Sequence, residues 1–364
     1  MPPAIAAFTD TYLPTVNGVT YTIRAWRDRW VDRGGRMDVV YPRSSHDPAG
    51  DEHPVPSLPF PFYDGFRLGV PSVPEGVRDV EIVHAHTPFS LGIAAVRLAR
   101  SVDAPLAVSY HTPTAEYAEY VAPGWATKGV SAASRRYESW FLDRADVVLT
   151  PSGSAADAVR ERTDAPVETH SNGVDVDFFR PTDPDAFRRR HDIPDDRPVV
   201  GYTGRHGFEK NLEAILKATA DLDVTVVFGG DGPARGTLER RAANMDTEVV
   251  FLGFLDREEL PEFYSVLDVF AFPSPVETQG LVAMEAIACG TPVVAVDDGA
   301  LSETVEAGRT GYHYDRGDVE KFGTAIERAL ENSDALSRYC LERRPEISLE
   351  RSMDRLESTY QRLL

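Results

Sequence analysis

The sequence predicts an α/β protein built from two doubly wound, mostly parallel sheets that face each other across a cleft. Short Val-rich apolar runs alternate with helix-length amphipathic stretches along the chain. The runs are continuously apolar, as in strands that are buried on both faces. A segment rich in Pro and charge at 178–197 separates the 364 residues into halves of similar size, so we expect one domain on each side of it.

The elements follow in order. The first half contains apolar runs that predict strands at 5–8, 37–41, 82–86, 106–110 and 147–150, with helices at 17–33 and 90–102. The second half contains predicted strands at 199–203, 224–229, 249–252, 269–272 and 292–296, with helices at 212–222 and 319–331. We expect domains at 1–178 and 179–347, and an amphipathic helix at about 348–364 that can pack back on the first domain.

Composition excludes several classes of protein. With 58 acidic and 38 basic side chains, the net charge is −20, which argues against nucleic-acid binding by electrostatics alone. Two Cys exclude a disulfide scaffold and a Cys-based zinc site. No apolar run reaches about 18 residues, so we expect no membrane span. No basic and apolar leader is evident at the N-terminus, which favours a cytoplasmic location.

The basic residues are unusual, because 34 are Arg and only four are Lys. An acidic surface repels itself at low ionic strength, and salt at about 1 M shortens the Debye length to about 3 Å. We therefore predict a protein adapted to a salt-rich, halophilic cytoplasm. The alternative is an ordinary acidic protein from a GC-rich genome. The acid excess is uneven, with a net charge of −7 in 1–178 and −13 in 179–364.

Candidate functional residues lie in loops that follow predicted strands, where open parallel sheets bind ligands. Gly18 stands where a helix begins after the first strand and would let a phosphate approach the backbone. Asn-Gly is also a common turn, so this signal is weak alone. After the strand at 199–203, Arg205 and Lys210 are placed to converge on one anion.

A third loop follows the strand at 269–272. It carries Glu277, and Glu285 comes eight residues later on the helix that this loop opens. The amides of Gly280, Leu281 and Val282 stand at the start of this helix and predict a second anion site.

These motifs, in this order, resemble glycosyltransferase family 4, whose members have the GT-B fold of two Rossmann-like domains. The resemblance covers nearly the whole chain and rests on Glu277-x7-Glu285, Gly204-Arg205…Glu209-Lys210-Asn211, Ser171-Asn172-Gly173-Val174-Asp175 and Asn17-Gly18-Val19. The segments 9–19, 86–92 and 110–112 are most similar to the branch that glycosylates lipids. One departure is His206-Gly207-Phe208, where the family has an apolar residue after Gly-Arg.

The resemblance implies roles in catalysis and donor binding. Arg205 and Lys210, next to Gly204, would hold the donor diphosphate, and Glu277 would bind the hexose hydroxyls. Glu285 would bind the ribose, and the Leu281 and Val282 amides, after Gly280, would meet the distal phosphate. The remaining implied contacts are those of Gly253, Phe254 and Leu255 with the base, of His111 with the sugar, and of Gly18 with the phosphates.

The same resemblance implies transfer with retention at the anomeric carbon. Two cations and a helix N-terminus can stabilise the leaving diphosphate, so no metal and no cofactor is expected. The Asp-x-Asp segments at 175–177 and 183–185 resemble the metal-binding motif of metal-dependent transferases. They lie at the connection between the predicted domains, so we do not expect them to bind a metal. His84-x-His86 is another possible ligand pair, and we expect it to be structural. A front-face mechanism is favoured because no second carboxylate can be assigned as the nucleophile.

The acceptor is expected on the first domain. Candidate contacts are Glu116, Tyr117 and Tyr120, the segment 54–74, and the basic-aromatic stretch 131–144, which could also lie on an anionic membrane surface. The leading hypothesis is a hexosyltransferase that uses a donor of the UDP-glucose or GDP-mannose type and a lipid or lipid-linked acceptor. The alternatives are a nucleotide-sugar epimerase or hydrolase of the same fold, and a non-catalytic sugar-nucleotide-binding module.

Overall fold

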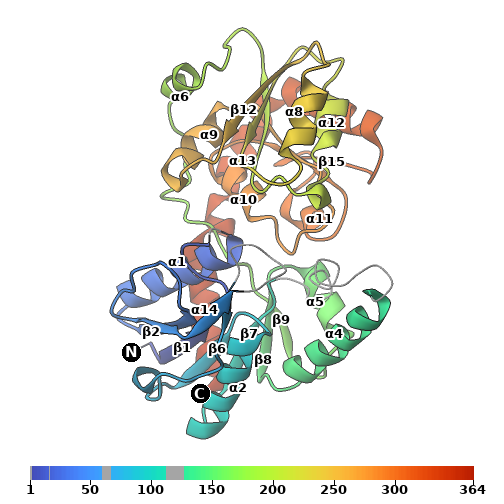
Figure 1. The fold of residues 1–364 in the computed structure, drawn as a ribbon. Helices are drawn as coiled ribbons and strands as arrows, with labels where there is room; N and C mark the ends of the chain where they lie inside the picture. The colour runs from blue at the N-terminus through green and yellow to red at the C-terminus, as the bar shows by residue number, and fades with distance from the viewer. Residues whose placement is uncertain (1, 16, 60–66, 112–126) are drawn as a thin grey trace. The chain divides into compact units, whose positions relative to one another are not determined.

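The computed structural model describes the chain except for residues 1, 16, 60–66 and 112–126, and for 127–132 it describes the backbone alone. The chain forms two compact units (Figure 1). The first unit comprises 1–172 together with 352–364, and the second comprises 173–351. The division therefore falls at 172/173, earlier than the predicted 178/179.

The first unit is built on a seven-stranded sheet in the order β3-β2-β1-β6-β7-β8-β9, in which all strand pairs are parallel. Its strands are β1 Ala4–Phe8, β2 Arg36–Pro42, β3 Glu52–Val55, β6 Ile82–Ala85, β7 Leu106–Ser109, β8 Val147–Thr150 and β9 Val167–Thr169. Its helices are α1 Gly18–Asp32, α2 Ser90–Val102, α4 Thr127–Leu142 and α5 Gly153–Arg160, and the end of α14 Leu349–Leu363 joins them.

Helices cover both faces of this sheet. On one side, α2 contributes Leu91 and Leu98 to a core that also contains Phe141 of α4. On the other, α1 buries Trp26 and Trp30. Trp30 packs edge-to-face on Tyr360 of α14 at a ring distance of 5.4 Å. The C-terminal helix thus covers the first unit, as its amphipathic pattern allows.

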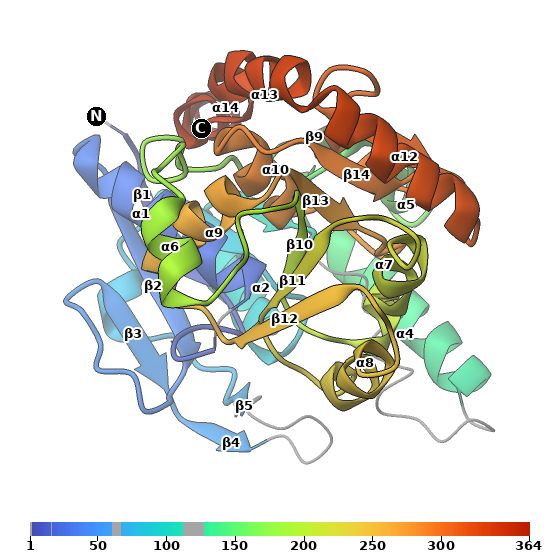
Figure 2. The same ribbon diagram turned by 90° about the horizontal axis from the view of Figure 1, so that it is seen from above.

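The second unit has a six-stranded parallel sheet in the order β12-β11-β10-β13-β14-β15. Its strands are β10 Val199–Thr203, β11 Thr225–Gly229, β12 Glu248–Gly253, β13 Val269–Phe272, β14 Val293–Val296 and β15 Gly311–Tyr314. Its helices are α6 Asp185–Arg190, α7 Glu213–Ala218, α8 Arg235–Ala242, α9 Leu260–Val266, α10 Leu281–Ala288, α11 Leu301–Thr304, α12 Val319–Glu331 and α13 Ser333–Ile347. Helices α7, α8 and α12 pack beside one another, and α6, α9, α10 and α13 form a second group of neighbours (Figure 2).

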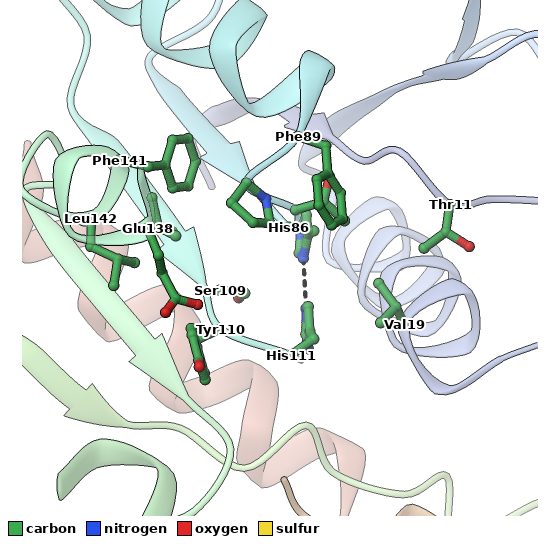
Figure 3. Close-up of a pocket in the computed structure, with 13 residues that line it drawn as sticks. Thr11, Val19, His86, Phe89, Ser109, Tyr110, His111, Glu138, Phe141 and Leu142 are labelled. Carbon is green, nitrogen blue, oxygen red and sulfur yellow. Dashed lines mark hydrogen bonds between the residues drawn. The ribbon is translucent and has the colours of Figure 1, made fainter. Parts of the chain in front are cut away.

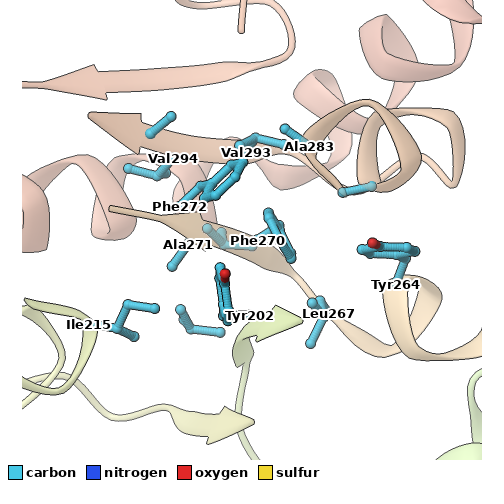
Figure 4. Packing of buried hydrophobic residues seen from close by; sticks show 14 of the residues in the cluster. Tyr202, Ile215, Tyr264, Leu267, Phe270, Ala271, Phe272, Ala283, Val293 and Val294 are labelled. Carbon is cyan, nitrogen blue, oxygen red and sulfur yellow. The ribbon is translucent and has the colours of Figure 1, made fainter. Parts of the chain in front are cut away.

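Buried strand residues form the core of the second unit. Phe270 and Phe272 of β13, Tyr202 of β10 and Val294 of β14 are almost completely buried and pack together (Figure 4). The rings of Tyr202 and Phe270 stack at 5.9 Å. This core fixes the edge of the sheet from which the candidate site residues emerge.

One stretch of the chain differs from the sequence-based expectation, and a second contains a small separate sheet. The segment 178–197, predicted to be a linker, contains α6 and buries Phe179 and Phe187 in the core of the second unit. The described part of 54–74 contains an antiparallel pair of strands, β4 Ser57–Pro59 and β5 Arg67–Gly69. Among the residues that the structure describes, no helix has the length and apolar character needed to cross a bilayer.

Candidate active site

Three site residues predicted in the second unit, Arg205, Lys210 and Glu277, lie in loops where its strand order reverses. β10 and β13 are neighbours in the sheet, although β11 and β12 separate them in the sequence. Their loops leave the sheet at its carboxyl edge, where open α/β sheets bind ligands. The loop after β10 carries Arg205 and Lys210, and the loop after β13 carries Glu277.

An ion pair joins these two loops. Lys210 Nζ donates to Glu277 Oε1 over 2.7 Å, and the two side chains are only 20% and 16% exposed. Arg205 Nη1 donates to Glu209 Oε1, also over 2.7 Å, and is 41% exposed. The structure therefore brings one predicted cation and one predicted carboxylate into direct contact and leaves the second cation at the surface of the same loop.

Glycine backbone holds the cation-bearing loop in place. Gly204 and Gly230 adopt φ of +136° and +101°, which side chains rarely allow, and a Cβ on Gly230 would overlap the carbonyl oxygen of Gly204. The amide of His206 donates to the carbonyl oxygen of Asp231 at 2.8 Å. The loop after β11 thus supports the loop that presents Arg205.

His206, the departure from the family pattern, occupies a buried position. Its side chain is fully buried, and Nε2 donates to the carbonyl oxygen of Gly229 at 3.1 Å. Burial lowers the pKa of His206, so the ring is a neutral core side chain at pH 7. The replacement leaves Arg205 and Lys210 on their loop.

The loop after β13 ends in α10, and the first turn of this helix has the geometry of an anion site. Gly280 precedes the helix with φ +79°, and a Cβ there would lie 2.6 Å from Leu301 Cδ2. The amides of Leu281 and Val282 stand in the first turn, before backbone i→i−4 bonds begin. The helix dipole adds positive potential at this end.

Glu285 lies one turn further along α10 and is partly buried. Its Oε2 accepts a hydrogen bond of 2.6 Å from the hydroxyl of Tyr264 on α9. Burial raises the pKa of Glu285 to about 7, while the Tyr264 hydroxyl and, more weakly, Arg257 act in the opposite direction. A carboxylate with this pKa changes charge near neutral pH, so ligand contacts to it depend on pH.

The end of β12 separates two residues that were predicted to act together. Gly253 turns the chain with φ +77°, and Phe254 is 62% exposed beyond it. Leu255 is instead buried and packs in the core of the second unit. The contact of Gly253, Phe254 and Leu255 with the nucleotide base stays a prediction, and the exposed ring of Phe254 is the side chain available for it.

The first unit has its own point of strand reversal, between β1 and β6. Gly18 is exposed at the first position of α1, and Asn17 caps this helix by accepting from Thr20 N at 2.9 Å. Asp10, after β1, is buried and accepts hydrogen bonds from Thr87 Oγ1 and Ser90 Oγ, both at 2.7 Å. The loops after β1 and β6 are thus held together around one carboxyl group.

His111 follows β7 and lines a pocket in the first unit, together with His86, Thr11 and Val19 (Figure 3). His111 Nε2 and His86 Nδ1 share a hydrogen bond of 3.1 Å. Burial lowers the pKa of His111 to about 4, so it is neutral at pH 7.

The remaining predicted residues divide into two groups. Glu116, Tyr117 and Tyr120, the acceptor candidates, lie outside the described residues. The Asp-x-Asp segments form local turns. Oδ1 of Asp175 accepts from the amides of Asp177 and Phe178, and Oδ1 of Asp183 accepts from Asp185 N. Within the described ranges, no group of three or more His, Cys, Asp or Glu side chains has metal-binding geometry.

Sequence reasoning missed three contributors to these sites. The first is the turn Gly229-Gly230-Asp231-Gly232, whose three glycines in four residues after a strand were a signal for close backbone approach. The second is Tyr264, which hydrogen-bonds Glu285, and no local pattern marks it. The third is His86, which was considered as a metal ligand but was not connected with His111.

Comparison with known proteins identifies the family. The profile of Glycosyltransferase Family 4 matches residues 16–178, and that of Glycosyl transferases group 1 matches residues 183–344. A GDP-mannose-dependent alpha-mannosyltransferase of Mycolicibacterium smegmatis is 33% identical over 90% of this chain and 87% of the relative. The chain belongs to glycosyltransferase family 4. As a member of this family it is a hexosyltransferase, and the resemblance drawn from its motifs is confirmed.

Other relatives of this glycosyltransferase agree with the assignment. The alpha-monoglucosyldiacylglycerol synthase of Streptococcus pneumoniae is 27% identical over 98% of this chain and 85% of its own length. A sucrose-phosphate synthase structure from Thermosynechococcus elongatus superimposes with a TM-score of 0.80 at 22% identity, and covers 99% of this chain and 98% of its own. Anabaena HepE in complex with UDP-glucose gives a TM-score of 0.78 at 18% identity, with 99% of both chains covered. These two structures confirm the predicted GT-B fold of two parallel-sheet α/β domains.

Proposed function

We propose that this glycosyltransferase moves a hexose from a nucleoside diphosphate sugar to a lipid or lipid-linked acceptor, with retention at the anomeric carbon. The observation that carries the proposal is the group formed by Arg205, Lys210 and Glu277 at the sheet edge, where β10 and β13 meet. Two cations and a carboxylate in this setting match a diphosphate bonded to a polyhydroxyl sugar.

Each part of the donor has a chemical counterpart in the second unit. The diphosphate carries negative charge and is matched by Lys210, Arg205 and the first-turn amides of α10. The hexose hydroxyls can donate to Glu277. The ribose hydroxyls can donate to Glu285, and the exposed ring of Phe254 offers an apolar face for the base.

The transfer breaks the bond between the anomeric carbon and the distal phosphate oxygen, which gains negative charge as the bond lengthens. Preorganised cations and amides stabilise that charge more in the transition state than in the bound donor. The acceptor hydroxyl forms the new bond on the same face and passes its proton to the departing phosphate. Lys210 and Arg205 supply positive charge for this step and the α10 amides supply N–H donors, so we propose that no metal ion is required.

The proposed acceptor and donor types rest on the relatives. The Mycolicibacterium relative is named for GDP-mannose, and the Streptococcus relative is named as a glucosyldiacylglycerol synthase. We infer a donor of the GDP-mannose or UDP-glucose type and a lipid acceptor, used by an enzyme that works at a membrane surface. Trp140 of α4 is 41% exposed and lies under the guanidinium of Arg144, which follows this helix, and the two provide a basic-aromatic patch suited to a lipid surface.

The test is incubation with a panel of radiolabelled nucleotide sugars and total membrane lipid in high salt, with and without EDTA. We expect EDTA-resistant transfer of one hexose to lipid, with an α-linked product from an α-linked donor. Glu277→Ala should abolish transfer and leave the fold unchanged. Label found only in water-soluble glycan would refute the lipid assignment, and release of free hexose alone would favour a hydrolase.

A further inference from the structure

Three histidines form a continuous row in the first unit. His84 on β6 is completely buried, and its Nδ1 and Nε2 contact the hydroxyls of Tyr360 and Ser109 at 2.6 and 2.8 Å. The ring of His84 stacks on that of His86 at 4.1 Å. His86, only 2% exposed, is in turn hydrogen-bonded to His111. The row therefore connects a fixed core histidine, His84, to His86 and His111, which both line the pocket.

The bond between His86 and His111 has an in-plane geometry. The two rings are nearly parallel, at 8°, and their centroids are 5.4 Å apart, whereas the nitrogens are 3.1 Å apart (Figure 3). Rings stacked face to face would have centroids closer than this, as in the His84–His86 pair. The indole of Trp26 lies 5.8 Å from His86 and 6.5 Å from His111, measured between ring centroids, and restricts both rings.

The surroundings of the two ring nitrogens of His86 decide which one carries the proton and donates to His111. Nε2 of His86 is buried and has no hydrogen-bond partner in the part of the chain that the structure describes. A buried N–H without a partner costs more than a buried lone pair without one, so the proton of His86 belongs on Nδ1. His86 Nδ1 then donates to Nε2 of His111, and the neutral His111 must carry its own proton on Nδ1.

We propose that His86 is a positioning residue that holds His111 as the Nδ1–H tautomer, ready to donate a hydrogen bond to an oxygen of the donor sugar. The inference rests on the proposed function for the contact between His111 and the sugar, although the tautomer itself does not. His86 acts through His111 and need not touch the substrate. His84 and its two hydroxyl partners keep the His86 ring in the orientation that this bond requires.

A matched pair of substitutions separates positioning from packing. The amide nitrogen of Asn can occupy the place of Nδ1 in His86→Asn and donate to His111, whereas His86→Leu has similar bulk and no donor. Both substitutions disturb the stacking on His84, so a purely structural role would affect them alike. We expect His86→Leu to lower kcat about tenfold, the value of one lost hydrogen bond, and His86→Asn to recover most of that loss.

The decisive measurement is the tautomer of His111 by ¹⁵N imidazole NMR, with the signal assigned by comparison with His111→Asn. We expect Nδ1–H in the wild type and in His86→Asn, and a mixture of tautomers in His86→Leu. His111 protonated on Nε2 in the wild type would overturn the proposal, even if neither variant folds. Equal kcat in the two variants, or a loss in His86→Leu that persists in a His111→Ala background, would also overturn it. If His111→Ala is fully active while the wild-type tautomer is as expected, then the proposed contact of His111 with the sugar is wrong, and the positioning of His111 by His86 is supported.

Discussion

The ionisation of Glu285 makes donor binding depend on pH in a way that can be calculated. The pKa of this carboxyl group in the free protein is raised to about 7, mainly by burial. Hydroxyl groups of a ribose donate hydrogen bonds, and therefore bind the ionised carboxylate better than the neutral acid. Above pH 7 the carboxylate is ready for the donor, and below pH 7 a proton must be released before the donor binds.

The magnitude follows from the pKa alone. One unit below the pKa about one tenth of the molecules are ionised, and one unit above it about nine tenths are, so donor affinity should rise about tenfold from pH 6 to pH 8. This corresponds to about 1.4 kcal/mol of binding free energy. Titration calorimetry with an intact nucleotide sugar, in buffers of different ionisation enthalpy, should detect about 0.9 proton released per donor bound at pH 6 and about 0.1 at pH 8.

Two variants test the source of the effect. Glu285→Gln should bind the donor more weakly, with no proton release between pH 6 and pH 8. Tyr264→Phe removes the hydrogen bond that opposes the effect of burial, and should move the midpoint upward by about one pH unit, since a hydrogen bond to a charged group contributes roughly 1.5–3 kcal/mol. Wild-type binding that does not change from pH 6 to pH 8 would refute the reasoning, as would a downward shift in Tyr264→Phe.

Three further predictions concern the loops and the charge. Lys210→Ala should reduce kcat by about 10²–10³ with unchanged thermal unfolding, because it removes positive charge at the leaving phosphate. Lys217 is an exposed lysine on α7, and Lys217→Ala should leave kcat unaltered in the same assay. Gly230→Ala should destabilise the protein by about 2–4 kcal/mol in urea unfolding, since the new Cβ would overlap Gly204. Gly34 also has a positive φ but has open space around it, so Gly34→Ala should lower the free energy of unfolding by only about 1 kcal/mol. Circular dichroism should show unfolding on dialysis from molar to low salt if acid repulsion opposes folding, and indifference to salt would contradict the halophile hypothesis.

Strands with a continuous apolar run could be predicted from sequence, including the edge strand β12, whereas the other three edge strands of the two large sheets could not. The ten predicted strands lie within one residue of strands in the structure, because two-sided burial requires continuous apolar runs. β4 and β5 were missed, and so were the edge strands β3, β9 and β15. The sequences of these edge strands, EHPV, VET and GYHY, are not fully buried and lack such runs. The linker prediction failed for a related reason, since a single buried Phe187 anchors α6 without producing a periodic pattern.

The residue types of the site could be predicted, but their partners could not. Lys210 and Glu277 lie in loops after predicted strands, which predicts that both stand at the same edge of the sheet. Only the strand order shows that β10 and β13 are neighbours and that the two side chains can meet. The contact of Tyr264 with Glu285 joins two helices, and local sequence carries no sign of it. The burial of Leu255 beside the exposed Phe254 was not predicted either, because sequence alone does not show which way a side chain points after a strand ends.

The ion pairs explain how so acidic a chain can keep cations in place for an anionic donor. The second half contains 35 acidic and 22 basic residues, and Lys210 and Arg205 each contact a carboxylate of their own. Under the proposed function, a diphosphate that binds Lys210 competes with Glu277 for the same ammonium group. Glu277 Oε1 then becomes available to accept hydrogen bonds from the hexose hydroxyls. The exchange of Glu277 for the diphosphate at Lys210 therefore provides a partner for both the diphosphate and the hexose. The first-turn amides of α10 carry no net charge that an acidic neighbour can neutralise, and so their attraction for phosphate persists in this setting.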